Sequence, residues 1–239
     1  MDMVISPSEK RAAYLRIVAD LASQFGISEE TVKTKFVIQE KRVIVSQPLT
    51  TSLNSIDFDP WKSPSGLNNP DEIKLDKNSW LYTTGIGLWV AQYNPTTGDY
   101  NYPIFSYVDT NYFVKAGEAL ALGKVYKGAL NFNSGSSNRL QDLSTTKFLH
   151  APQTQTFVPT AGVAVNPMFN NATAVAEMQP HLVIDGSGDN TFTLKLGAGV
   201  NTNIDGSSTG ALRNRVMLVL DGYEVKNAAA TADACVRGY

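Results

Sequence analysis

The uncharged run from Trp80 to Gln92, WLYTTGIGLWVAQ, constrains the fold of this chain more than any other segment. Its aromatic and β-branched residues are typical of a β-strand. Strict alternation places on one face Trp80, Tyr82, Ile86, Leu88 and Val90, and on the other Leu81, Trp89 and Ala91. Gly85 and Gly87 leave room for a close neighbour or mark a bend in the sheet. Because both faces are largely apolar, we expect a central strand of a β-sandwich.

An amphipathic helix is predicted ahead of the strand-like segments. Ser6 is a favoured N-cap, Pro7 suits the first helical turn, and Gly26 is a favoured residue just past a helix end. Apolar side chains recur along one face of this helix, as the stripe Tyr14, Val18, Leu21 and Phe25. Such a stripe has to pack on another surface, so we predict an assembly arm whose four apolar residues contact neighbouring subunits.

Strand-like segments fill most of the remaining chain. They are predicted at 36–45, 80–92, 102–107, 125–132, 147–157, 181–185, 191–196 and 213–226. The segments 181–185 and 191–196 flank a Gly-rich turn and are expected to pair as a hairpin, whereas 48–70 is expected to be loop. About eight strands without strand–helix alternation favour a mainly β fold, a single jelly-roll-like β-sandwich with an N-terminal helical arm. The expected domains are the arm at 1–34, the β domain at 35–226 and a tail at 227–239.

The composition disfavours several classes of protein. The formal net charge is −2 and only 18% of residues are charged, so no basic field points to nucleic acid. The single cysteine, Cys235, allows no internal disulfide, and no apolar run is long enough for a membrane-spanning helix. The first ten residues lack the pattern of a secretory signal. We therefore expect a soluble protein made in a reducing compartment, with a neutral surface of Asn, Thr, Ser and Gly.

Residue patterns that support catalysis or cofactor binding are missing from the sequence. The only histidines, His150 and His181, lie in different predicted elements, and no nucleophile elbow or phosphate-binding loop occurs. Oxygen ligands alternate from Asp185 to Asn190 as in calcium loops, but the twelfth position is Leu196, inside a predicted strand. We expect no enzymatic activity, no cofactor and no metal, and a hairpin turn at Asp185–Asn190.

A helix-turn-helix-like segment at residues 18–34 gives one alternative function, DNA binding. Ala22 would allow close helix approach, Gly26 would take the turn conformation, and Val32 would pack back from the second helix. Against this alternative, Glu29 and Glu30 at the start of the second helix would repel phosphate. The unit also lacks a third helix. Packing is therefore favoured over contact with nucleic acid.

A second alternative is binding of carbohydrate or a host surface by the β-sandwich. Tyr93, Tyr100 and Tyr102 lie close together in the sequence, around a predicted turn. Exposed aromatic rings of this kind can stack on sugars, provided that the tyrosines are not buried.

Residues 80–226 resemble a known family in the order of their features. The segments that carry this resemblance are LYTTGIGLWV at 81–90, YPIF at 102–105, DTNYF at 109–113, VYKGAL at 125–130, KFLHAPQTQ at 147–155, TFTLKL at 191–196 and RVMLVLDGYEVK at 215–226. The chain resembles jelly-roll capsid or capsid-associated proteins of bacteriophages. The resemblance implies a virion structural protein that self-assembles in the host cytoplasm and contacts other virion proteins. It implies no catalytic residues.

Overall fold

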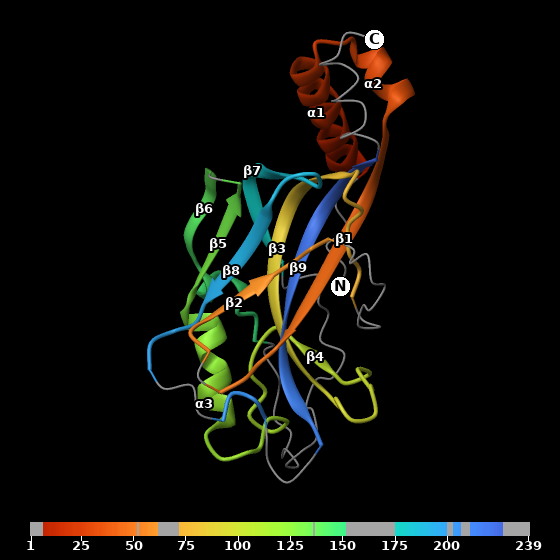
Figure 1. The fold of residues 1–239 in the computed structure, drawn as a ribbon. Helices are drawn as coiled ribbons and strands as arrows, with labels where there is room; N and C mark the ends of the chain where they lie inside the picture. The colour runs from red at the N-terminus through yellow and green to blue at the C-terminus, as the bar shows by residue number, and fades with distance from the viewer. Residues whose placement is uncertain are drawn as a thin grey trace.

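The computed structural model describes residues 7–51, 53–61, 72–135, 137–151, 175–199, 203–206 and 211–226. Within these residues the chain is mainly β, as predicted. Two antiparallel sheets face each other as a β-sandwich, and two N-terminal helices lie at one end of it (Figure 1). The predicted tail, 227–239, lies outside the described residues.

The first sheet has five strands, and β9 and β3 form its centre. Its order is β1-β9-β3-β4, and β7 pairs with β3 along the same edge as β4. The strands of this sheet are β1 (Val37–Pro48), β3 (Trp80–Tyr93), β4 (Ile104–Phe105), β7 (Ala176–Asp185) and β9 (Arg213–Lys226). Strand β9 is buried on both faces from Asn214 to Leu220, which agrees with its continuous apolar sequence.

The second sheet has four strands in the order β2-β8-β5-β6. Its strands are β2 (Ser55–Phe58), β5 (Ala129–Ser134), β6 (Ser137–Ser144) and β8 (Asn190–Lys195). Three short helices, α3 (Glu118–Leu122), η1 (Gly123–Lys127) and η2 (Thr145–Phe148), lie in the connections on either side of β5 and β6. Strand β2 lies inside a stretch that was predicted to be loop, and β6 was not predicted.

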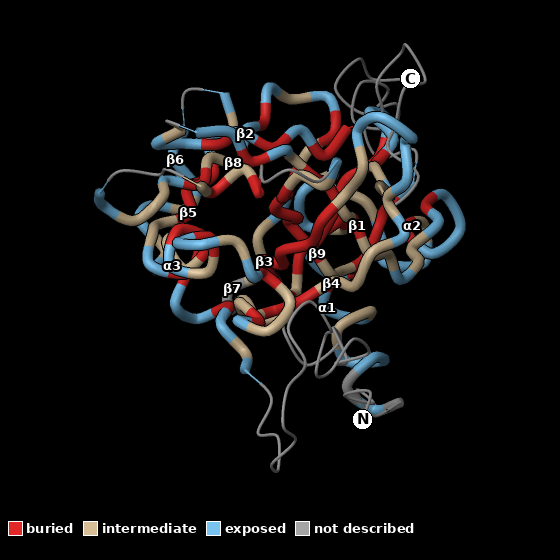
Figure 2. Tube along the Cα trace, turned by 90° about the horizontal axis from the view of Figure 1, so that it is seen from below, coloured by how far each residue is buried: buried red, intermediate tan, exposed pale blue. Residues whose placement is uncertain are grey.

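The main hydrophobic core fills the space between the two sheets, where Figure 2 shows the buried stretches of chain gathered. Leu88 and Val90 of β3 and Leu218 of β9 contribute from the first sheet. From the second sheet, the rings of Phe132 and Phe192 stack with centroids 4.4 Å apart. Burial of these side chains from both sheets is the main favourable contribution to the stability of the sandwich.

A β-bulge in β3 overturns the predicted faces of this strand. Its register shifts between Thr83 and Gly85 against both β7 and β9. An extra residue reverses the side of every side chain beyond it. Leu81 therefore joins the inner core with Ile86, Leu88 and Val90, whereas Trp80 and Tyr82 share the outer face with Trp89 and Ala91.

Three further predictions of local structure were wrong. Strands β7 and β8 follow one another through a short turn but do not pair, because β7 joins the first sheet and β8 the second. Residues 125–127 belong to the 3-10 helix η1, so β5 begins only at Ala129. The segment 147–157 is not a strand where it is described, and residues 152–157 lie outside the described part.

Candidate functional site

The predicted assembly stripe packs on the chain's own first sheet. It lies on α1 (Pro7–Phe25), and Val18 and Leu21 are fully buried in a second core with Trp80 and Tyr82. Phe25 stacks on Trp80 and on Phe36, with ring centroids 5.3 and 5.4 Å apart. Tyr14 is partly buried against the same cluster. The stripe is therefore covered by the chain itself, and its role in contacts with other copies stays a prediction.

The helix-turn-helix-like segment folds much as its sequence indicates. Gly26 has φ of +63°, and the Ile27 N–H bonds to the Ala22 carbonyl across the turn. Ser28 caps α2 (Glu29–Lys35) by accepting a hydrogen bond from the Thr31 N–H at 3.2 Å, and Val32 is buried. Strand β1 begins almost directly after α2, so the described residues place no third helix here. Binding of this segment to DNA stays a prediction.

Glu29 and Glu30 are both exposed at the start of α2. The Lys33 ammonium lies 2.7 Å from the Glu30 carboxylate, which neutralises part of the positive charge near the helix. An acidic helix start repels the phosphate backbone of DNA. The electrostatics of α2 therefore favour a packing role.

Two of the three tyrosines considered for sugar binding stack on each other. The rings of Tyr93 and Tyr100 are nearly parallel with centroids 5.3 Å apart, and the Arg215 guanidinium lies 5.1 Å from the Tyr100 centroid. Tyr93, Tyr100 and Tyr102 are all partly exposed. The mutual stacking and the guanidinium reduce the aromatic surface that a sugar could cover.

The histidines are in separate places. The His150 backbone N–H donates to the Ser106 carbonyl, and the Ser106 hydroxyl donates to the His150 backbone carbonyl. Burial lowers the pKa of His181 on β7, and the nearby Arg16 guanidinium lowers it further. Among the described residues no three side chains of His, Cys, Asp or Glu lie close enough to hold a metal ion.

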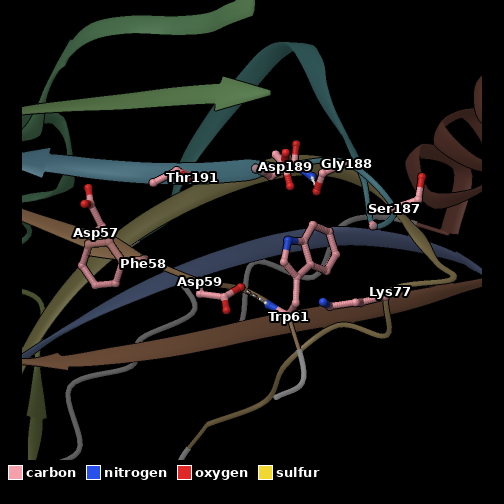
Figure 3. A pocket seen from close by; sticks show the side chains of 11 residues that line it. Asp57, Phe58, Asp59, Trp61, Lys77, Ser187, Gly188, Asp189 and Thr191 are labelled. Carbon is pink, nitrogen blue, oxygen red and sulfur yellow. Dashed lines mark hydrogen bonds between the residues drawn. The ribbon is translucent and has the colours of Figure 1, made fainter. Parts of the chain in front are cut away.

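A hollow lies at the end of the sandwich (Figure 3). Its volume is about 580 Å³, and it lies where β2 ends and β8 begins. The segment Asp57–Trp61 lines one side, the turn Gly186–Thr191 lines the other, and Lys77 stands at the rim. The turn lies beside the start of β3, because the Gly186 N–H bonds to the Ser79 carbonyl. The start of β3 and the helices are at the same end of the sandwich (Figure 1).

The turn that lines the hollow is held by its own side chains. The Asp185 carboxylate accepts hydrogen bonds from the Ser187 N–H at 2.9 Å and from the Ser187 hydroxyl at 2.8 Å. The Asn190 amide donates to the carbonyls of Asp185 and Gly188. These bonds form a tight turn, as predicted for this segment instead of a calcium loop. The turn joins the two sheets, however, and does not close a hairpin.

Carboxylates dominate the electrostatics of the hollow. Asp57, Asp59 and Asp189 line it together with a single cation, Lys77. Asp57 accepts a hydrogen bond from the Thr193 hydroxyl at 2.6 Å, and Asp59 accepts one from the Trp61 backbone N–H at 3.0 Å. Each carboxylate oxygen can accept more than one hydrogen bond, so both groups keep capacity to accept from a ligand.

No pattern in the sequence predicts this hollow. Asp57 and Trp61 lie in a stretch that was predicted to be loop, and Lys77 and Asp189 belong to distant segments. The only local signal was the turn at Asp185–Asn190, which was predicted to be a hairpin turn and for which calcium was the only ligand considered.

No family model, no curated protein and no solved structure matches this chain significantly. None of the helices in the described part of the chain is long and apolar enough to cross a membrane.

Proposed function

We propose that this chain is a structural subunit of a bacteriophage virion, a capsid or capsid-associated protein that acts by self-assembly. The observation that supports this function best is the order of the strands. If the short strand β4 is set aside, one sheet reads β1-β9-β3-β7 and the other reads β2-β8-β5-β6. Successive strands then alternate between the sheets, except for the consecutive pair β5 and β6.

This order supports a jelly roll, in which eight strands form two facing sheets with Greek-key connections. Viral capsid proteins are one of the large groups that use this architecture. Lectins use it as well, so the strand order favours assembly only together with the resemblance of residues 80–226 to capsid proteins.

The outer face of the second sheet supports lateral packing. Amide and hydroxyl groups cover much of it, and Asn131, Asn133, Asn138, Gln141 and Thr193 line a shallow depression of about 190 Å³ with Lys195. Neutral hydrogen-bonding side chains can exchange water for a partner at low desolvation cost, whereas buried charges cannot. This face fits contacts between identical subunits.

Strand β6, at the edge of the second sheet, favours contacts through side chains over pairing of strand edges. The register between β5 and β6 is irregular on both sides of Phe132, and Asp142 has φ of +48°. Irregular, twisted edges hinder the addition of a further strand from another chain. We therefore place the subunit contacts on the outer face of this sheet.

Light scattering coupled to size-exclusion chromatography tests this function. We expect the full-length chain to form assemblies whose size grows with protein concentration. The double variant Asn133→Arg/Gln141→Arg adds two charges to the proposed contact face and should shift the chain towards monomer. Asn78→Arg, at an exposed turn, is the matched control and should assemble normally. A full-length chain that stays monomeric at all concentrations and salt conditions would overturn the proposal.

A further inference from the structure

We propose that the hollow between Asp57–Trp61 and Gly186–Thr191 binds a neutral carbohydrate. This ligand site goes beyond the proposed assembly function and does not depend on it. The inference rests on two buried polar atoms, each without a hydrogen-bond partner in the described part of the protein, in residues that line the hollow.

One atom is a hydrogen-bond donor and the other is an acceptor. The Trp61 indole Nε1 and the Asn190 Oδ1 are both buried, and neither has a hydrogen-bond partner within the described part of the protein. Trp61 is only 5% exposed and Asn190 only 7%. Figure 3 shows the Trp61 indole across the hollow from Gly188 and Asp189, which are next to Asn190 in the chain.

These two atoms without hydrogen-bond partners limit the kinds of ligand that the hollow can bind. A buried polar atom without a partner costs free energy that a bound group can recover. The indole N–H needs an acceptor and the amide oxygen needs a donor, and a hydroxyl group can serve both. Ligands that present several hydroxyl groups in a fixed geometry are carbohydrates.

The charges of the lining residues disfavour anions as ligands, and the unpaired indole N–H disfavours a cation alone. Asp57, Asp59 and Asp189 outnumber the single ammonium of Lys77, so phosphate and other anions are repelled. A cation alone would satisfy the carboxylates but would offer no acceptor to the Trp61 N–H. Sugar hydroxyls can donate to these carboxylates and accept from Lys77 and Trp61.

The size and walls of the hollow also suit a sugar. A volume of about 580 Å³ lies within the range of pockets that hold small molecules. The indole of Trp61 is the aromatic part of the lining, and aromatic rings can pack against the C–H groups of a pyranose ring. Because Trp61 Nε1 and Asn190 Oδ1 are both buried, binding must shift the indole or the rim side chains to bring a ligand into contact with them.

Titration calorimetry of the full-length chain tests the site, with D-glucose, D-galactose, D-mannose, N-acetyl-D-glucosamine and their β-linked disaccharides as probes. At least one probe should bind saturably, and tryptophan fluorescence should change with the same midpoint. Trp61→Phe removes the donor and keeps an aromatic ring, so we expect affinity to fall about three- to tenfold. Asp189→Asn, at the exposed rim, should also weaken binding without affecting the fold.

Trp89→Phe is the matched control, because Trp89 Nε1 is likewise buried and unpaired among the described residues but does not line the hollow. This variant should bind sugar as the unchanged chain does, and all three variants should assemble normally. Three results would overturn the inference: no binding of any probe, binding that Trp61→Phe and Asp189→Asn leave unchanged, or selective binding of a divalent cation or a cationic peptide instead.

Discussion

At the scale of single residues, the bulge in β3 decides what each side of the first sheet can contact. The alternation of Trp80–Gln92 was clear from the sequence, but the extra residue between Thr83 and Gly85 was not. The Thr84 hydroxyl donates a hydrogen bond to the Asp221 carbonyl at 3.2 Å. This bond joins segments that are far apart in the chain. A bulge depends on such partners, so local propensity predicts the strand and not the change of face.

Gly222 is required opposite the bulge. A Cβ atom at this position would lie 2.0 Å from the Tyr82 carbonyl oxygen and 3.0 Å from the Thr83 Cα. Gly222→Ala should therefore destabilise the fold by about 2–3 kcal/mol, since backbone must move to relieve the overlap. Urea unfolding measures this loss.

Gly123→Ala is the matched control for this substitution. Nothing lies within 4 Å of a Cβ built at Gly123, and its backbone is helical. This variant should keep or slightly raise the free energy of unfolding. If Gly222→Ala were as stable as the unchanged chain, the described packing at the bulge would be wrong.

Buried and partly buried tyrosines predict a loss of stability at alkaline pH. Burial is the main cause that raises the pKa values of Tyr82, Tyr107 and Tyr112 from 10.0 to about 12. Because the folded pKa values exceed the unfolded ones, this stability is complete below pH 10 and is lost as pH rises towards 12. Urea midpoints measured across this range should fall, and Tyr82→Phe should make the fall shallower. A constant midpoint would contradict the burial of these rings.

At the scale of elements, the helices are predicted to be part of the folded subunit. Leu21 is fully buried in the contact between α1 and the first sheet, whereas Leu15 on the same helix is 44% exposed. Leu21→Ala should lower the free energy of unfolding by about 2–4 kcal/mol because it leaves a cavity. Leu15→Ala should change it by less than about 0.5 kcal/mol. Equal effects of the two substitutions in urea unfolding would show that α1 is not docked as described.

The elements that sequence could predict are those with strong local patterns. The helix up to Phe25 and the strands around Trp80–Gln92 and 213–226 have clear apolar periodicity, and the structure contains them. Strand β6 carries the polar sequence SNRLQDLS, so only its pairing with β5 makes it a strand. The turn between β7 and β8 looks like a hairpin turn, but each strand finds a better partner in a different sheet. In these cases, pairing with strands elsewhere in the sequence determines the structure, and local propensity does not.

At the scale of the whole molecule, the hydrophobic core between the sheets and the core beneath the helices are separate clusters of buried residues. The core between the sheets contains none of the residues of α1 and α2, which belong to the second core with Trp80 and Tyr223. Removal of residues 1–35 should therefore leave a folded sandwich with a lower urea midpoint, and should impair assembly. Circular dichroism and light scattering check both results. Complete unfolding of the shortened chain would show that the helices are an essential part of the core.

The candidate hollow forms only when the fold brings distant segments of the chain together. Trp61, Lys77 and Asn190 come from three segments that meet at the end of the sandwich. No spacing rule in the sequence brings them together, because β2 itself was not predicted. The neutral polar surface, in contrast, follows from composition, and the amides on the outer face of the second sheet agree with it.

Electron microscopy of the concentrated full-length chain tests the central claim, function by self-assembly, most directly. We predict ordered particles, tubes or sheets whose repeating unit has the size of one sandwich, packed side by side through the outer face of the second sheet. Isolated single subunits under every condition, with no ordered material, would contradict it.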